Sequence, residues 1–292
     1  MTKIPAAQVP GVYHRRTGDI VVTAISDGYL DGAYEFMRDI TPQDAERILK
    51  DAHRPAPPRI SINCFVIHSA GRVALMETGS GNSMGPTLGK MPQNLAAAGI
   101  DTKSIDTILL THMHPDHSNG LTDEHGAAKF PHIELVVAER DVAHWFDDAA
   151  MARATERQQM RFFRWAREQI APYQNQRRDA KGEVFPGVTA EPIPGHTPGH
   201  TAYRIASKGE QLLIWGDIVH IPDIQTRRPD VYMEPDVDGP AAIAMRKRVF
   251  DMVTTDRLLA AGMHMHFPGF LNLNRRPNGG YELVPEIWQQ AL

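Results

Sequence analysis

The feature that most constrains this chain is a run of seven residues that crowds three histidines and one aspartate together. It follows directly after an apolar segment, residues 105–110, that is typical of a buried strand. Side chains alternate along an extended loop, so we expect His112 and His114 to project to one side, with Asp116 and His117 turned to the other. Imidazole nitrogens and carboxylate oxygens suit zinc, and they also suit iron, manganese and cobalt. The run can therefore offer ligands to two adjacent metal ions; it reads Thr111-His112-Met113-His114-Pro115-Asp116-His117.

Further candidate ligands follow the ends of predicted strands elsewhere in the chain. His196 lies in a loop rich in glycine and proline, which favours a tight and fixed conformation. Asp217 and His264 each come after an apolar segment that is predicted to form a strand. Ligands at the ends of rigid strands are held more firmly than ligands on free loops. The sequence thus predicts a metal centre assembled from distant parts of the chain.

Composition narrows the classes of function. The 292 residues include 31 Lys and Arg against 35 Asp and Glu, and this net charge of −4 argues against a nucleic-acid partner. Cys64 is the single cysteine, which excludes an intrachain disulfide and fits a reducing compartment. No apolar run is long enough for a transmembrane helix, and the first residues lack the apolar segment of a signal peptide. We therefore expect a cytoplasmic protein without a membrane partner.

The pattern of strands and helices predicts an α/β layered fold. Residues 1–19 are interpreted as a loose N-terminal arm and residues 20–292 as a single domain. Residues 174–183 are expected to form a surface loop, and the basic run 246–248 to lie on a solvated helix face. Helices are predicted at 39–52, with Thr41 as N-cap, and at 92–98, 142–170 and 241–253. Strands are predicted at 20–25, 60–68, 72–76, 105–110, 135–138, 188–190, 201–205, 212–215 and 258–262.

The order of these histidines and aspartates resembles the metallo-β-lactamase superfamily of metallohydrolases. The resemblance covers residues 20–269 and implies a four-layer αββα sandwich with a metal site at the edge of its two sheets. It implies two divalent metal ions, with Zn²⁺ as the first expectation and Mn²⁺, Co²⁺ or Fe²⁺ as alternatives. By position, it assigns one ion to His112, His114 and His196 and the second to Asp116, His117 and His264, with Asp217 bridging both.

Three details refine the resemblance. The pattern Gly262-x-His264 followed by Pro268-Gly269 favours His264 over the competing His266 as the last ligand. His220 stands three residues after the bridging aspartate, where many homoserine lactone lactonases have tyrosine, and this favours the methyl parathion hydrolase-like branch. Glu77 occupies a position where the family usually has aspartate, and we expect its carboxylate to orient a metal ligand.

The resemblance implies a hydrolase that cleaves lactones, aryl esters or phosphotriesters through attack by a metal-bridging hydroxide. Asp116 is expected to accept a proton or to stabilise the leaving group, and His220 to help stabilise the developing oxyanion. No arginine or lysine clamp is evident in the sequence, which is consistent with neutral substrates. Trp145, Phe146 and Phe267 are the candidates for the wall of the substrate pocket.

Other functions on the same scaffold remain open at this point. A thioesterase of the glyoxalase II type would require basic residues that the sequence does not place, and a β-lactamase-like amide hydrolase would usually be exported. A nuclease should be more basic, and a mono-iron sulfur dioxygenase would leave Asp116 and His117 unused. A non-catalytic binding protein would be expected to lack some of the seven ligands. The resemblance also suggests a homodimer in which the N-terminal arm contributes contacts.

Overall fold

The computed structural model describes residue 4 and residues 8–292, and it is built on two seven-stranded sheets. The first sheet has the order β1 (Val12–Thr17), β2 (Ile20–Asp31), β4 (Arg59–Ser69), β5 (Arg72–Met76), β6 (Thr107–Leu109), β7 (Glu134–Val137) and β8 (Arg177–Asp179). The second has the order β16 (Tyr281–Pro285), β15 (Phe270–Arg275), β14 (Leu259–Ala261), β12 (Glu210–Ile214), β11 (Thr201–Ser207), β10 (Val188–Pro192) and β9 (Gly182–Phe185). A small third sheet pairs β3 (Met37–Arg38) with β13 (Tyr232–Met233).

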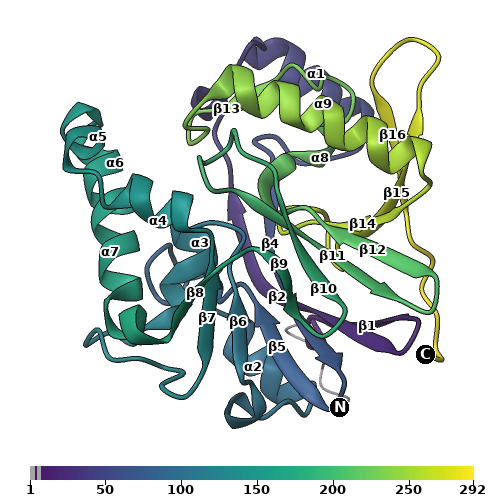
Figure 1. Ribbon diagram of the computed structural model, residues 1–292. Coiled ribbons are helices and arrows are strands. Elements are labelled where there is room, and N and C mark those ends of the chain that lie inside the picture. Colours follow the sequence, from purple (N-terminus) through teal and green to yellow (C-terminus); the bar gives the residue numbers. More distant parts are fainter. Residues whose placement is uncertain (1–3, 5–7) are drawn as a thin grey trace.

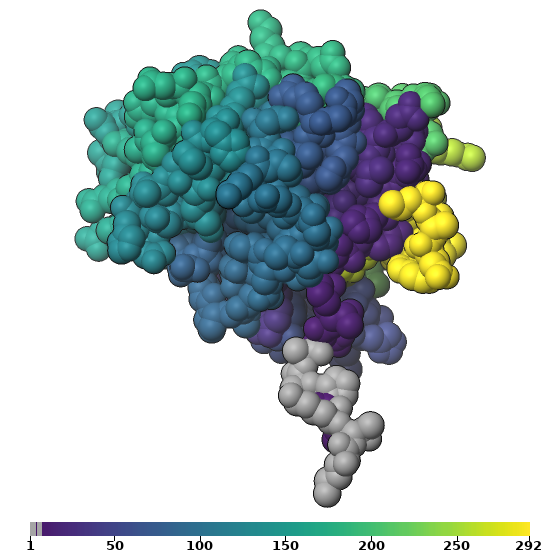
Figure 2. Space-filling view, turned by 90° about the horizontal axis from the view of Figure 1, so that it is seen from below, coloured from purple at the N-terminus to yellow at the C-terminus, as the bar shows by residue number. Residues whose placement is uncertain are grey.

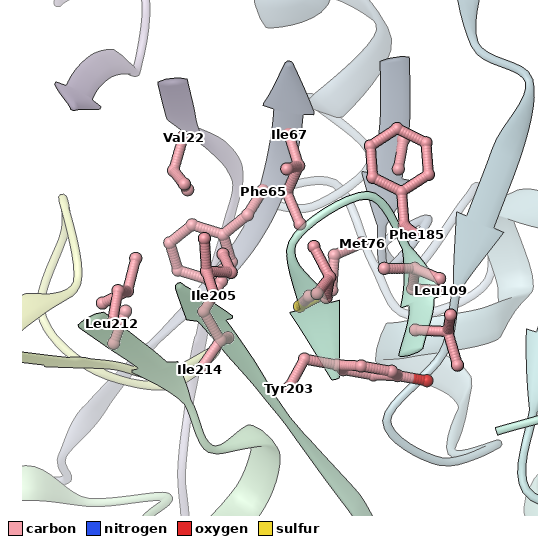
Figure 3. Packing of buried hydrophobic residues seen from close by; sticks show 14 of the residues in the cluster. Val22, Phe65, Ile67, Met76, Leu109, Phe185, Tyr203, Ile205, Leu212 and Ile214 are labelled. Carbon is pink, nitrogen blue, oxygen red and sulfur yellow. The ribbon is translucent and has the colours of Figure 1, made fainter. Parts of the chain in front are cut away.

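The two large sheets pack face to face around an apolar core. Strand β4 shows why, because Phe65 and Ile67 alternate with Cys64 and Val66 and so bury both faces of the strand. Figure 3 shows that Phe65 and Ile67 lie on the face of the first sheet that packs against Ile205 of the second sheet. The other face packs against helices, which gives the αββα layers that the resemblance implied.

Helices cover the outer faces of both sheets (Figure 1). Apolar side chains of α2 (Met91–Ala97), α4 (Glu139–Trp145) and α7 (Trp165–Ile170) pack on the first sheet, and those of α9 (Gly239–Thr255) pack on the second. Helix α1 (Pro42–Asp51) and α8 (Pro222–Gln225) share a further apolar cluster. The remaining helical segments are η1 (Tyr34–Phe36), η2 (Thr102–Ser104), α3 (Pro115–Ser118), η3 (Asn119–Leu121), α5 (Asp148–Arg153), α6 (Glu156–Gln158), η4 (Gln159–Arg164), η5 (Ala171–Gln176) and η6 (Gly216–Ile218).

Helix α1 begins as predicted, since the Thr41 hydroxyl accepts a hydrogen bond from the backbone N–H of Asp44 and Pro42 is the first helical residue. The long helix predicted for 142–170 is instead a series of short helices, which Asp147 and Thr155 interrupt as N-caps. Within the described residues, no helix combines the length and the apolar character needed to cross a bilayer.

Three expectations about the surface of the chain are wrong. Residues 12–17 are not a loose arm, because they form β1 and pair along their whole length with β2. Residues 174–183 are not a plain surface loop, since β8 and the start of β9 form there as edge strands of the two sheets. In the basic run 246–248, Arg246 is buried and its guanidinium donates to the carbonyl oxygens of Ile218, Pro229 and Val231, whereas Lys247 and Arg248 are exposed as expected.

The N-terminal and C-terminal segments lie side by side, as the purple and yellow surfaces in Figure 2 show. An ion pair between Arg15 and Glu286 joins them. Residues 1–3 and 5–7 of the expected arm lie outside the described residues, and so does any dimer contact that they make. The division into an arm and one domain stays a prediction.

Parallel strand pairs bring the candidate ligands to one edge of the fold. Strands β5 to β8 run parallel in the first sheet, and β12 runs parallel to β14 in the second. The carboxyl ends of parallel strands meet at the same edge, which is where ligand sites of such sheets form. The histidine run follows β6, Asp217 follows β12 and His264 follows β14, so all three reach this edge.

Candidate metal centre

Three imidazoles, which we call the three-imidazole set, converge on one point. The set consists of His112, His114 and His196. The distance from His112 Nε2 to His114 Nδ1 is 3.0 Å, from His114 Nδ1 to His196 Nε2 2.9 Å, and from His196 Nε2 to His112 Nε2 3.1 Å. Nitrogen ligands of a tetrahedral zinc ion lie about 3.3 Å apart, given zinc–nitrogen bonds of about 2.0–2.1 Å. The spacing of the three nitrogens therefore fits one metal ion.

A second group, which we call the mixed set, adds a carboxylate. It consists of Asp116, His117 and His264. Asp116 Oδ2 lies 3.7 Å from His117 Nε2 and 3.5 Å from His264 Nε2. Both ring nitrogens of His117 are buried and have no hydrogen-bond partner among the residues that the structure describes. Buried polar atoms almost always have a partner, so these unsatisfied nitrogens point to a ligand.

Asp217 lies between the two sets. Its Oδ2 atom is 3.6 Å from His112 Nε2 and 3.4 Å from His196 Nε2 on one side. On the other side it is 3.2 Å from His117 Nε2 and 3.0 Å from His264 Nε2. The seven candidate ligands predicted from the sequence are thus brought together, and their donor atoms fit two divalent cations.

Local structure explains how the histidine run supplies both sets. His114 has an extended backbone and is the N-cap of the short helix α3, which Pro115 starts. This helix carries Asp116 and His117. The His112 ring lies 4.1 Å from that of His117 and 4.7 Å from that of His114, between centroids, so the run is not divided into two opposite sides as the alternation predicted.

The loop that carries Asp217 is held by a glycine and a histidine. His200 Nε2 accepts a hydrogen bond of 3.0 Å from the backbone N–H of Asp217. Gly216 has a φ of +56°, and a Cβ atom there would lie only 2.3 Å from His200 Nε2. Burial lowers the pKa of His200 to about 3, so its ring stays neutral and able to accept. The sequence analysis assigned no role to His200.

Carboxylates and carbonyls orient the ligand rings. Asp236 Oδ1 lies 2.6 Å from His196 Nδ1, and the Ser61 carbonyl lies 3.0 Å from His264 Nδ1. Burial would raise the pKa of Asp236, but the hydrogen bond and charge of His196 lower it to about 2. Metal-binding histidines typically donate their second N–H to such groups. Asp236 was missed because a lone aspartate in an irregular segment carries no sequence signal.

Glu77 holds the start of the histidine run. Its Oε1 atom accepts a hydrogen bond of 2.9 Å from the Thr111 backbone N–H, and its Oε2 atom lies 3.5 Å from His117 Nδ1. No hydrogen bond joins these last two atoms in the described part of the chain, so the orienting role expected of this carboxylate stays a prediction. Asp141, a further buried carboxylate missed in the sequence, accepts from the Met113 backbone at 2.8 Å and the Gly199 backbone at 3.3 Å. It links the two histidine loops.

The charges of the two sets differ. Burial and the neighbouring imidazoles lower the pKa of His112 and His114 well below the usual value. Burial would also lower the pKa of His117, but the carboxylates of Asp217, Asp116 and Glu77 raise it well above the usual value. The carboxylates around the mixed set therefore make it the more negative of the two sets, and it attracts positive charge more strongly.

His220 is the eighth polar side chain at the centre. Its Nε2 atom lies 3.3 Å from Asp217 Oδ2, and its ring stacks on that of His264 with centroids 5.2 Å apart. Both of its ring nitrogens lack a hydrogen-bond partner. His266, the competing candidate, instead points to Asp223, with 2.7 Å between His266 Nε2 and Asp223 Oδ2. The geometry groups His264 and not His266 with the other ligands.

An apolar cavity of about 140 Å³ opens on the centre. Donor residues from both sets reach it, together with His220, and apolar side chains form most of its wall. Its lining includes Leu30, Phe36, Ile60, Met84, Phe162, Met233, His114, Asp116, Asp217, His220 and His264. Two arginines, Arg157 and Arg161, also line it, although no cationic clamp was evident in the sequence.

None of the aromatic residues predicted for the pocket lines this cavity. Trp145 is buried behind the centre, with its ring centroid 5.3 Å from that of His114. Phe146 and Phe267 are 40% and 37% exposed and lie outside the lining. Phe162 takes the expected position, with its ring 4.7 Å from that of His114. Phe162 belongs to residues 142–170, which the sequence predicts to be helical.

Comparisons with known proteins agree with this geometry. Residues 57–264 match the sequence model of the metallo-beta-lactamase superfamily. Among solved structures, the hydrolase AbOPH of the β-lactamase superfamily is 30% identical, with 97% of this chain and 100% of that chain covered and a TM-score of 0.90. AidC, described as a dizinc quorum-quenching lactonase, is 24% identical, with 96% and 99% covered and a TM-score of 0.89.

One curated protein is similar over a shorter stretch. The uncharacterized protein YobT of Bacillus subtilis (strain 168) is 27% identical over 161 residues, which are 55% of this chain and 63% of that protein. The match therefore spans less than two thirds of the relative.

Proposed function

Because this chain belongs to the metallo-beta-lactamase superfamily and is a hydrolase of it, we propose that it is a dinuclear enzyme that hydrolyses lactones, aryl esters or phosphotriesters. One observation carries the proposal. Asp217 Oδ2 lies within 3.0–3.6 Å of ring nitrogens from both the three-imidazole set and the mixed set. A carboxylate in that position can serve two ions at once.

The donor set supports two divalent ions, of which zinc is our first choice. Five histidine nitrogens and two aspartate carboxylates provide the nitrogen and oxygen ligands that zinc accepts, without thiolate. When bound, such an ion pair supplies Lewis acidity and a nucleophilic water at neutral pH. Second contacts from Asp236 and the Ser61 carbonyl keep the rings of His196 and His264 in the orientation that this requires.

The chain's own residues then bind the substrate and move its protons. His220 reaches the cavity with unpartnered nitrogens, so a ring N–H can donate to the substrate oxygen that gains negative charge. The Asp116 side chain is 14% exposed at the cavity, where it can accept a proton from the attacking water or pass it to the leaving group. The apolar wall formed by Leu30, Phe162 and their neighbours binds the body of the substrate and excludes water.

The cavity, and not the similarity to solved structures, supports the proposed substrate class. AidC is a lactonase, but at 24% identity its likeness is one of fold. An apolar cavity beside two cation sites suits an ester or lactone carbonyl attached to an apolar group.

The deciding experiment is a hydrolysis panel on protein loaded with Zn²⁺, Mn²⁺ or Co²⁺. The panel compares γ-lactones, dihydrocoumarin, aryl esters, a paraoxon-type triester and a cephalosporin, and metal content is measured on the same samples. We expect turnover of a lactone, aryl ester or triester with two ions per chain. Turnover of the cephalosporin alone, or full activity with one ion, would contradict the proposal. Light scattering on the same samples tests the homodimer, which stays a prediction.

A further inference from the structure

The cavity carries positive charge that the candidate metal ligands do not explain. Besides the donor residues and His220, three charged side chains line it: Arg157, Arg161 and Glu234. Arg157 and Glu234 face each other, with 3.8 Å between Arg157 Nη1 and Glu234 Oε2. The Arg157 guanidinium also lies 4.6 Å from the ring centroid of Phe36. Arg157 and Glu234 therefore largely balance each other.

Arg161 has no such partner. In the part of the chain that the structure describes, no hydrogen bond or ion pair joins its guanidinium to another residue. It lies half-buried, 5.5 Å from the ring centroid of Trp165. Burial and the charge of Arg157 lower the pKa of Arg161, against the opposing effect of Asp116. Such a cation contributes little to folding, because it is desolvated without a partner.

The backbone holds Arg161 firmly beside the metal centre. It belongs to η4, a π-helical turn, and the next residue, Phe162, packs its ring 4.7 Å from that of His114. A capping box formed by Thr155 and Gln158 fixes the chain just before this turn. Gln158 also donates a hydrogen bond of 3.2 Å to Glu234, which lines the cavity. Single π-helical turns occur frequently at functional sites.

We propose that the substrate carries a carboxylate, attached to an apolar body, and that this carboxylate pairs with Arg161 while the ester or lactone group lies at the metal centre. The proposal rests on the proposed function and names the substrate class within it. A guanidinium binds a carboxylate through two parallel hydrogen bonds, which a neutral phosphotriester cannot replace. The apolar wall formed by Leu30, Ile60 and Met233 would hold the chain that separates the two polar ends.

Matched pairs of esters test this charge directly. The half-ester mono-4-nitrophenyl adipate and the neutral 4-nitrophenyl hexanoate have the same number of acyl carbons and the same leaving group. The glutarate and succinate half-esters, each paired with its neutral ester, vary the reach. For the best length, we expect metal-loaded wild type to prefer the charged ester about 10-fold in kcat/KM, as charge-assisted hydrogen bonds allow.

Variants then assign the preference to Arg161. In Arg161→Gln we expect the ratio of charged to neutral kcat/KM to fall about 10-fold, mainly through KM, and Arg161→Lys should restore part of it. Arg164→Gln, a change at an exposed position of the same turn that lies outside the cavity, is the matched control and should leave the ratio unchanged. A preference that persists in Arg161→Gln, or its absence in wild type, would overturn the proposal.

Binding separates this inference from the hydrolase proposal. Adipic acid monoanilide and hexananilide mimic the two esters, and calorimetry measures their affinity without turnover. We expect the monoanilide to bind about 10-fold more tightly to wild type, and this margin to disappear in Arg161→Gln. If that result holds while no ester is hydrolysed, only the proposed reaction fails. If esters are hydrolysed without a charge margin in either assay, only the role of Arg161 fails.

Discussion

The two halves of the candidate centre share Asp217 but differ in composition and exposure. The three-imidazole set contains no carboxylate, and the rings of His112 and His196 contact Thr111 and Asp236 through their second nitrogens. The mixed set includes Asp116, whose side chain is 14% exposed, whereas the rings of the three-imidazole set are at most 3% exposed. Both sets reach the cavity, but in the proposed dinuclear centre the exposed edge of Asp116 gives the mixed set a carboxylate that can meet substrate.

The largest effect should come from substituting Asp217, the residue that the two halves share. Asp217→Ala removes the oxygen that approaches both sets, so we expect kcat/KM to fall about 1000-fold or more and metal content to fall in both halves. Elemental analysis and ester turnover on the same sample check this. Full activity of Asp217→Ala would contradict the dinuclear arrangement.

Single substitutions within each half should separate them. His112→Ala and His264→Ala each remove one ring from one set, and we expect each variant to lose about one ion per chain and about 100-fold or more in turnover. Circular dichroism serves as the folding control. Loss of both ions from each variant would show that the halves do not bind independently.

The contact between Asp236 and His196 of the three-imidazole set can be tested against a matched control. Asp236→Asn weakens the contact to His196 Nδ1, and loss of such a second contact typically lowers metal affinity about 10–100-fold. Asp223→Asn is the matched control, because Asp223 makes a similar contact, 2.7 Å to His266 Nε2, outside the ligand sets. Competition with a chelator measures both affinities. Equal changes in the two variants would remove the special role of Asp236.

The smallest effect is expected for His220, which lies beside the mixed set but is not one of its proposed metal ligands. His220→Ala should lower kcat about 10-fold while both ions stay bound, since it removes one hydrogen-bond donor. Stopped-flow turnover with metal analysis measures this. An unchanged kcat would remove the proposed contact to the oxyanion.

The sequence points to the candidate ligands because each carries a local signal. The run at 111–117 is dense, and Asp217 and His264 each follow an apolar strand. The positioning residues carry no such signal. Asp236 is 40 residues from His196 in the sequence and Asp141 is 28 residues from Met113, and no pattern in the chain marks that approach.

The errors in the fold have related causes. Strand β1 lacks clear alternation, and pairing with β2 rather than its own pattern stabilises it. Arg246 belongs to a charged run that predicts exposure, yet three backbone carbonyls satisfy its guanidinium inside the protein. Arg161 is the opposite case, because its place in the cavity depends on the π-helical turn that carries it.

The parallel strands described above have a consequence for folding. Because β6 belongs to the first sheet and β12 and β14 to the second, an ion held at this edge would connect the two sheets. Cations that bind only the folded chain stabilise it by mass action, by about 2.7 kcal/mol at a concentration 100 times the dissociation constant. With the proposed metal centre, the supply of free metal would thereby affect how much of this protein is folded, as well as how much of it is active.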